Sequence, residues 1–367
     1  MKVLYAPVGI TPTKPLTASH LRGVLLVDAM QKIRSRIDDV TVWHNRRPWD
    51  ISLQTTQFWG YLDTHFPDHD YSSETDISLG MKYVRANAAS FEASAEMLQG
   101  YTSGVDSSGY LHPSAQRMLT IWRDVFSSIS VDPDIITRSD AFEDSAENVM
   151  GRLDKLGILL DQRGQGGCGY IDLTDEGLPL RKIVDADGSA NYIVAILRDI
   201  WMRAQSFDKT FLVYDSSVER DYILLERVLR LTGVECQRCP FKRVPVNGAV
   251  LSSREGGWKG TTAGELLVKL REFSVAAISL GLRMYFLYQL GLRNPTGFDA
   301  AQLHRQVEAS EKLIGELGNY CNVEMPLAFW QQFRTRSDDI DIYRVLSMIA
   351  GKKVSAAEKS ALVGCLI

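Results

Sequence analysis

The alternation of apolar and polar positions at the start of the chain predicts a strand, a helix and a second strand. Residues 2–8 are mostly apolar and predict a buried strand. A loop over 9–19 follows, and residues 20–37 have helical periodicity. The apolar positions of that helix are Leu21, Val24, Leu25, Val27 and Ile33. Residues 39–45 predict the second strand, so the segment is a βαβ unit, which implies a parallel sheet.

The middle of the chain, about 55–165, is polar with helical periodicity, and we expect a helical insertion there. Glycine and serine residues cluster at 102–109 and at 163–169, which predicts two loops. A short strand is predicted at 170–175. The insertion would separate the first βαβ unit from the rest of its domain.

The strand and helix pattern resumes after the insertion. Residues 191–204 predict a helix, and the apolar run 210–215 predicts a strand. Residues 219–232 predict a further helix that ends at Gly233. We therefore expect an α/β, Rossmann-like nucleotide-binding domain over residues 1–270, with a parallel sheet and the helical insertion.

The remaining residues, 271–367, predict an α-helical module. A turn is expected at 293–297. The segment 275–292 is long and apolar enough to resemble a membrane span. However, Arg283 lies near its centre, where a charge is costly in lipid, so we predict a buried helix and no membrane partner.

Composition is that of an ordinary globular protein. The chain has 367 residues, of which 45% are hydrophobic, and a net charge of −4, so it has no general basic field and we expect no DNA partner. The five cysteines do not suggest a disulfide framework, and the N-terminus does not resemble a signal peptide, so we expect a cytoplasmic protein. Cys236 and Cys239 have the spacing of half a zinc site, but we find no second pair and expect no metal there.

Two polar stretches are candidates for phosphate chemistry. His20 begins the helix after the first strand, where backbone N–H groups and the helix dipole favour anions. The stretch 247–267 contains hydroxyl residues, glycines and Arg254, which could meet charge on a polyphosphate. Thr261 or Thr262 is expected to cap the next helix. Each stretch taken alone also fits an ordinary surface loop.

Together the two stretches resemble the signatures of the class I aminoacyl-tRNA synthetases, and specifically those of the arginyl-tRNA synthetase family. The first family signature has the form Lys-Pro-x-His-x-Gly-His-Leu-Arg, and residues 14–22 read KPLTASHLR. The second ends in Ser/Thr-Arg-x-Gly, and residues 252–256 read SSREG. Further segments follow the order and spacing of the family, namely 40–54, 170–175, 185–200, 207–217, 280–290 and 297–299. The resemblance covers most of residues 3–320 and implies a class I synthetase catalytic domain followed by a helical module.

The resemblance implies a site for ATP with Mg²⁺. His20 matches the second histidine of the first signature and would hydrogen-bond the triphosphate, whereas Thr17 replaces the first histidine. Ser19 replaces the glycine on which adenine rests. Ser253 stands where many class I enzymes have a lysine, and Lys14 is placed to supply that charge, as in some arginyl enzymes. The implied catalytic residues are His20, Lys14 and Arg254, and the implied ATP contacts are Thr17, Ser19, His20, Gly23, Ser252, Ser253 and Arg254.

The implied amino-acid pocket departs from the family. Tyr192 matches a pocket tyrosine, but Ile196 stands where an aspartate pairs with the substrate guanidinium. Val218 replaces a glutamine, Thr11 replaces an asparagine, and Asp215 completes the expected pocket. Burying a guanidinium without its carboxylate is unfavourable. We therefore expect free arginine to be a poor substrate and a smaller or more apolar carboxylic acid to be preferred.

Three functions stay open at this point. The first is an ATP-dependent ligase that forms an aminoacyl-adenylate and transfers the acyl group to a small amine, a peptide or tRNA. The second is a compact arginyl-type enzyme that charges tRNA. The third is a synthetase-like binding or regulatory protein without catalysis. The family's N-terminal tRNA-contact domain has no counterpart before the first strand, so we expect a truncated relative.

Overall fold

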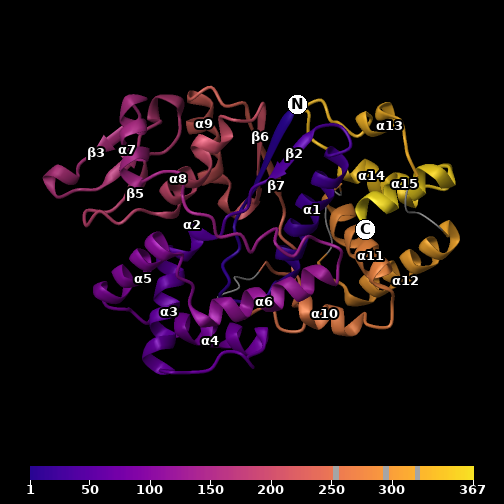
Figure 1. The fold of residues 1–367 in the computed structure, drawn as a ribbon, viewed down its shortest axis with the longest axis horizontal. Coiled ribbons are helices and arrows are strands. Elements are labelled where there is room, and N and C mark those ends of the chain that lie inside the picture. Colours follow the sequence, from indigo (N-terminus) through magenta and orange to yellow (C-terminus); the bar gives the residue numbers. More distant parts are fainter. Residues whose placement is uncertain (251–255, 292–296, 319–322) are drawn as a thin grey trace.

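A four-stranded parallel sheet lies at the centre of the computed structural model, which describes residues 1–250, 256–291, 297–318 and 323–367 (Figure 1). Its strands are β1 (Lys2–Pro7), β2 (Asp39–Val42), β6 (Lys209–Asp215) and β7 (Cys236–Phe241), in the order β2-β1-β6-β7. All three strand pairs are parallel, and Tyr5 of β1 lies between Val42 and Phe211 of its neighbours. The parallel sheet predicted from the sequence is therefore confirmed.

The two central strands are apolar on both faces because helices cover both sides of the sheet. Tyr5 and Phe211 belong to one hydrophobic cluster, together with α1 (Ala18–Arg34). Leu4 and Leu212 point to the opposite face and pack in a second cluster with α8 (Tyr192–Ala204) and α9 (Glu219–Leu231).

From the two central strands, β1 and β6, the chain continues to the two edge strands, β2 and β7. Helix α1 leads from β1 to β2 on one side, and α9 leads from β6 to β7 on the other. A crevice is therefore expected between the carboxyl ends of β1 and β6, where ligands bind in open α/β sheets. The helix preceding β6 and the helix following it have the predicted bounds to within a residue or two, and Gly233 has a φ of 82° just after α9.

The insertion is helical, as predicted, but it ends in a small sheet. Its helices are α2 (Arg47–Asp50), α3 (Leu53–His65), α4 (Asp76–Ala88), α5 (Ala95–Ser108), α6 (Pro113–Ser127) and α7 (Ala146–Lys155). An antiparallel sheet of β3 (Leu159–Asp161), β4 (Gly169–Ile171) and β5 (Arg181–Val184) follows. The strand predicted at 170–175 is thus shorter and belongs to this second sheet.

The loop predicted at 102–109 is wrong, because most of this segment is the C-terminal half of α5. The hydroxyls of Thr102, Ser107 and Ser108 each donate to the carbonyl four residues earlier, so they are satisfied within the helix. Val105 is buried and fixes the helix against its neighbours. The helix ends only at Gly109, which has a φ of 68°.

The C-terminal part of the described chain is helical and packs directly on α1. Its helices are α10 (Ala263–Lys269), α11 (Val275–Tyr288), α12 (Ala300–Leu317), α13 (Leu327–Gln331), α14 (Ile342–Ala350) and α15 (Ala356–Leu366). Thr262 caps α10, as predicted. One hydrophobic cluster runs from α1 into these helices, and the domain boundary at residues 270 and 271 stays a prediction.

The helix predicted at 275–292 is α11, and its Arg283 is fully buried. The guanidinium bonds to the carboxylate of Asp28 on α1 and donates to the carbonyls of Ile129 (3.1 Å) and Ser279 (3.0 Å). Within the described residues, no helix is both long and apolar enough to cross a membrane.

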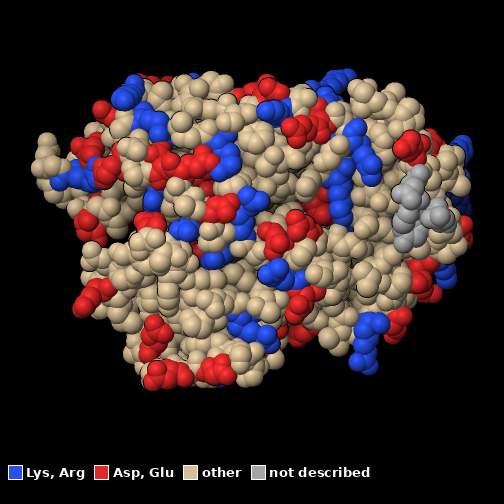
Figure 2. Space-filling model, in the orientation of Figure 1, with Lys and Arg blue, Asp and Glu red and all other residues tan. Residues whose placement is uncertain are grey.

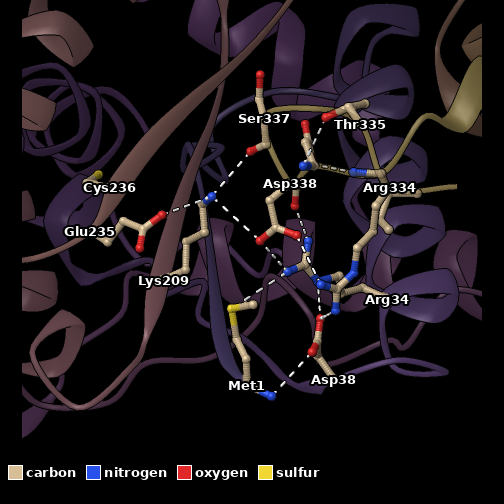
Figure 3. A network of polar contacts seen from close by, with 12 residues as sticks. Met1, Arg34, Asp38, Lys209, Glu235, Cys236, Arg334, Thr335, Ser337 and Asp338 are labelled. Atoms are coloured by element: carbon tan, nitrogen blue, oxygen red, sulfur yellow. Dashed lines mark hydrogen bonds and ion pairs between the residues drawn. The ribbon is translucent and has the colours of Figure 1, made fainter. Parts of the chain in front are cut away.

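A second polar network joins the C-terminal helices to the amino end of the sheet (Figure 3). Arg34, at the end of α1, pairs with Asp38 at 2.6 Å and with Asp338 at 2.9 Å. Lys209, at the start of β6, donates to the carbonyl of Ser337 at 3.2 Å. This network lies at the opposite end of the strands from the crevice. Acidic and basic side chains are interspersed over the face of the molecule seen in Figure 2.

Candidate functional site

A cavity of about 70 Å³ opens at the carboxyl ends of β1, β6 and β7, beside the first turns of α1. Its position is the one expected from the strand order. The residues that line it are Pro7, Val8, Gly9, Ile10, Ser19, His20, Gly23, Val24, Val27, His44, Ile135, Ile136, Val213, Asp215, Phe241 and Arg243. Of the predicted site residues, the cavity therefore brings together Ser19, His20, Gly23 and Asp215.

His20 and Thr17 form a capping box at the start of α1. The backbone N–H of Thr17 donates to Nδ1 of His20 (3.1 Å), and the backbone N–H of His20 donates to the Thr17 hydroxyl (3.4 Å). Because Nδ1 accepts a hydrogen bond, the neutral ring carries its proton on Nε2. Burial, reinforced by the charges of Lys14 and Arg243, holds the pKa of His20 well below its usual value of 6.5. A hydrogen bond with the backbone of Pro15 acts in the opposite direction but is outweighed, so the ring of His20 is neutral.

Ser19 and Gly23 set how closely α1 approaches the last strand. The Ser19 hydroxyl accepts a hydrogen bond from the backbone N–H of Val244 at 2.9 Å. A Cβ at Gly23 would lie 2.6 Å from Cζ of Phe241, so a larger residue would force the helix or the ring to move. Ser19 thus replaces the signature glycine with a side chain that holds the wall of the cavity.

Positive charge is concentrated beside the cavity. Arg243 lines it, with Nε 4.0 Å from Oδ1 of Asp215. Buried Arg22 donates to the carbonyls of Lys242 (2.9 Å) and Arg243 (3.3 Å) and so fixes this segment. Lys14 lies over the ring of Tyr83, 5.6 Å from its centroid, and is close enough to lower the pKa of His20. The first turn of α1 contains no acidic residue, so its dipole is free to favour an anion.

The residues that follow the second signature lie against the first signature. The backbone N–H of Ala263 donates to the carbonyl of Leu16 at 2.8 Å. Helix α4 contacts both segments, because a Cβ at Gly80 would lie 2.5 Å from Pro15 and 2.8 Å from Trp258. The predicted ATP contacts Ser252, Ser253 and Arg254 lie outside the described residues, and their roles stay predictions.

The predicted amino-acid pocket is only partly assembled. Ile196 lines a second cavity of about 20 Å³ on the α8 side of the sheet, and Pro7 and Gly9 line both cavities. Tyr192 stacks on Trp49, with ring centroids 5.4 Å apart, and its hydroxyl bonds to Asp221.

Two predicted pocket residues line neither cavity. Thr11 is buried and accepts a hydrogen bond from the Thr13 hydroxyl at 3.3 Å. Val218 packs against the second hydrophobic cluster, just before α9.

Comparison with known proteins agrees with this geometry. The chain is 23% identical over 282 residues to the arginine–tRNA ligase of Francisella tularensis subsp. novicida, covering 68% of this chain and 47% of that protein. The structure superposes on the arginyl-tRNA synthetases of Thermus thermophilus (TM-score 0.58, 13% identity) and Plasmodium falciparum (TM-score 0.54, 13% identity). Each superposition covers 99% of this chain and 73% of the other.

The chain has the arginyl-tRNA synthetase fold. It spans about half the length of the curated relatives it matches. No protein-family model matches it.

Three residues that line the cavities of this arginyl-tRNA synthetase fold were not predicted from the sequence. Arg243 follows β7, a strand that was itself not predicted, so no signal pointed to it. His44 follows β2 by two residues and is a polar residue at the end of a parallel strand, which is a usable signal. Asp199 lies three residues after Ile196 on the same apolar face of α8, and helical periodicity could have found it.

The two cysteines considered as half a zinc site lie on strand β7. Cys239 bonds through its thiol to Oδ2 of Asp339 at 3.1 Å, and burial raises the pKa of both thiols, that of Cys236 to about 12. Among the residues that the structure describes, no group of three or more His, Cys, Asp or Glu side chains is placed to hold a metal ion. Both thiols are buried within the sheet.

Proposed function

We propose that the chain is an ATP-dependent ligase that activates an amino acid as its adenylate. The observation that carries the proposal is the cavity between the carboxyl ends of β1 and β6, which adjoins the first turns of α1. Helix N–H groups, Arg243 and Lys14 favour a polyphosphate there. The similarity to arginyl-tRNA synthetases supports a ligase of the aminoacyl-tRNA synthetase kind.

In this proposal, a carboxylate oxygen of the amino acid attacks the α-phosphorus of ATP. The new O–P bond forms as the bond to the β-phosphate oxygen breaks, and pyrophosphate leaves with the electron pair. The Nε2–H of His20 would donate to a phosphate oxygen, and Arg243 and Lys14 would stabilise charge on the phosphates. Catalysis would therefore rest on positioning and charge neutralisation.

Mg²⁺ would enter this site bound to the phosphates of ATP, and it would neutralise part of their charge. The described residues that line the cavity include one carboxylate, that of Asp215, so they do not make a protein site for the ion. In the steps above, the contacts to the phosphates come from the protein's own side chains.

The second half-reaction would transfer the acyl group to an amine or hydroxyl. The acceptor oxygen or nitrogen attacks the acyl carbon, AMP leaves, and the acceptor loses a proton. A small amine, a peptide or tRNA would fit this chemistry, and charging of total tRNA with labelled amino acid separates tRNA from the others.

The free described cysteines suit a reducing cytoplasm.

One observation favours a second candidate, a nucleotide-binding protein without ligase activity. His20 Nδ1 and the Ser19 hydroxyl each accept a hydrogen bond from a backbone N–H group. In this candidate the two residues therefore have a structural role only. This candidate predicts ATP binding without turnover.

Calorimetric titration with Mg–ATP tests the cavity as an ATP site. We expect the wild type to bind and His20→Ala to bind roughly tenfold or more weakly, because a hydrogen bond to a charged group contributes about 1.5–3 kcal/mol. Ser355→Ala is the control: it removes the capping box of α15 and costs about 1 kcal/mol of stability, with no change in ATP affinity. Equal binding by His20→Ala, or none by the wild type, contradicts the assignment.

A further inference from the structure

The second cavity adjoins the first at the end of β1. Pro7 and Gly9 line both, and the second cavity continues between β6 and α8 on the opposite face of the sheet from α1. An acyl-adenylate with its phosphate at the first cavity would therefore direct its side chain toward the second. This step, and the inference built on it, rests on the proposed function.

Trp49 limits the size of the second cavity. Its indole packs on the bare Cα of Gly9, where a Cβ would lie 1.6 Å from Nε1 of the indole. Trp49 is fixed from behind by its stack on Tyr192, whose hydroxyl bonds to Asp221, itself paired with Arg181 at 2.9 Å. A volume of about 20 Å³ accommodates one or two groups the size of water.

One wall of this cavity carries a buried carboxylate. Asp199 is 4% exposed, and Trp43 Nε1 donates to its Oδ2 at 3.1 Å, while Asn45 Nδ2 donates to its Oδ1 at 2.8 Å. Each oxygen keeps a further lone pair for a donor. The neighbouring walls are apolar, formed by Ile196 and Leu212 among others.

The polar partners of Asp199 are themselves fixed. Asn45 also donates to the carbonyl of Asp140 at 2.8 Å, which orients its amide. The guanidinium of Arg203 lies over the Trp43 ring and its charge lowers the pKa of Asp199, whereas the charge of Glu143 raises it. Burial raises the pKa of Asp199 to about 6, so the carboxylate is ionised at neutral pH and would gain from a donor.

We infer that the amino acid activated here has a short side chain ending in a hydrogen-bond donor, with Trp49 limiting its length and Asp199 accepting from its tip. Three methylenes and a guanidinium do not fit in the space that Trp49 leaves. A purely apolar side chain would fit only by leaving the carboxylate against methyl groups, which is unfavourable because its remaining lone pairs would lack a donor. A hydroxyl or an ammonium on the β-carbon is short enough for the space beside Trp49 and can donate to Asp199.

This inference reverses part of the expectation from the sequence. Ile196 removes the carboxylate at one position of α8, but Asp199 supplies one nearly a turn further along the same face. A smaller substrate is still expected, whereas a more apolar one is not.

Amino-acid-dependent ATP–pyrophosphate exchange tests the inference with a matched series of alanine, serine, 2,3-diaminopropionate, valine and arginine. We expect serine or 2,3-diaminopropionate to exceed alanine and valine by roughly tenfold, which corresponds to about 1.4 kcal/mol. Serine and 2,3-diaminopropionate separate the hydroxyl from the ammonium as the tip. Asp199→Asn should reduce this preference, and Trp49→Ala should admit longer amines such as ornithine.

Trp49→Phe is the size control, since it keeps a ring over Gly9 and should keep the preference for short side chains. A series led by arginine or valine, or a ranking unchanged in Asp199→Asn, overturns the inference and leaves the proposed ligase intact. Absence of exchange with every amino acid overturns both. A Trp49→Ala protein that folds, retains serine exchange and gains none with ornithine contradicts the role of Trp49.

Discussion

The two nitrogens of His20 have different partners, and this difference defines what the residue can do. Nδ1 accepts from the Thr17 backbone and completes the cap of α1, which leaves the proton on Nε2. The replacement of the first signature histidine by Thr17 is therefore explained by packing, because threonine is a good N-cap. The sequence predicted both residues as ATP contacts and did not reveal that they bond to each other.

Prediction at the residue scale also had clear limits. The resemblance assigned Ser19, His20 and Gly23 to ATP and Asp215 to the amino-acid pocket, and the structure places all four around one cavity. Asp199 was not predicted, because the family resemblance points to position 196 of α8 and not to position 199. Side-chain pairing across distant segments has no local signature in the chain.

Buried His44 makes stability depend on pH. Its Nε2 donates to the carbonyl of Val8 at 3.2 Å, and burial lowers its pKa to about 4 from 6.5. The unfolded chain therefore binds more protons below pH 6.5, and stability is lost as the pH falls from 6.5 toward 4. Between pH 7.5 and pH 5 the wild type should lose about 2 kcal/mol relative to His44→Gln, measured by urea unfolding.

Comparing the wild type with His44→Gln cancels the pH-dependent contributions of other buried groups to stability. Asp50, whose pKa burial raises to about 7, and Asp199 act with the opposite sign, because their folded forms bind protons more readily. They are present in both proteins. A gap between the two proteins that does not change with pH would show that His44 is not buried in its neutral form.

At the scale of elements, the strongest periodic segments were predicted well. Strands β1 and β6 are largely apolar runs and α9 has a clear apolar face, so local sequence sufficed for them, whereas α1 is buried on most sides, including Arg22 and Asp28. Strand β7 was missed because its sequence, CQRCPF, contains an arginine and a proline, which an edge strand tolerates. Its pairing with β6 joins separate segments of the chain, so a short stretch of sequence does not reveal it.

The contact of α1 with β7 depends on Gly23. Gly23→Ala would place a methyl 2.6 Å from Phe241, so we expect a loss of about 1–3 kcal/mol in urea unfolding. Gly151→Ala is the matched control, because this glycine also lies within a helix, α7, and has open space at its Cβ. That variant should be more stable by about 0.5–1 kcal/mol. A Gly23→Ala protein as stable as Gly151→Ala would contradict the close approach of α1 to β7.

At the scale of the whole molecule, α1 is the element that joins the site to the C-terminal helices. Its first turns line the cavity, while Asp28 further along bonds to Arg283 of α11. The sequence predicted a sheet region and a helical region, and the apolar character of α11 predicted its burial. It did not predict that Arg283 would be buried in a specific pairing with α1, because Asp28 lies 255 residues away in the chain.

Removing Asp28 tests this junction. Asp28→Leu should cost about 3–5 kcal/mol in the free energy of unfolding, because Arg283 would stay buried without its counter-charge. The double variant Asp28→Leu, Arg283→Met should recover most of that loss. Glu308→Ala breaks an exposed pair with Lys312 and should change stability by less than about 1 kcal/mol. A double variant no more stable than Asp28→Leu would contradict the pairing.

The central claim is that this fold still makes an acyl-adenylate, and amino-acid-dependent ATP–pyrophosphate exchange measures that step directly. The account predicts exchange by the wild type with at least one amino acid of a full panel. His20→Ala should lower the rate roughly 100-fold, by analogy with loss of one charge-stabilising donor. Folded wild-type protein that binds ATP and shows no exchange with any amino acid would contradict the claim and favour the nucleotide-binding protein without catalysis.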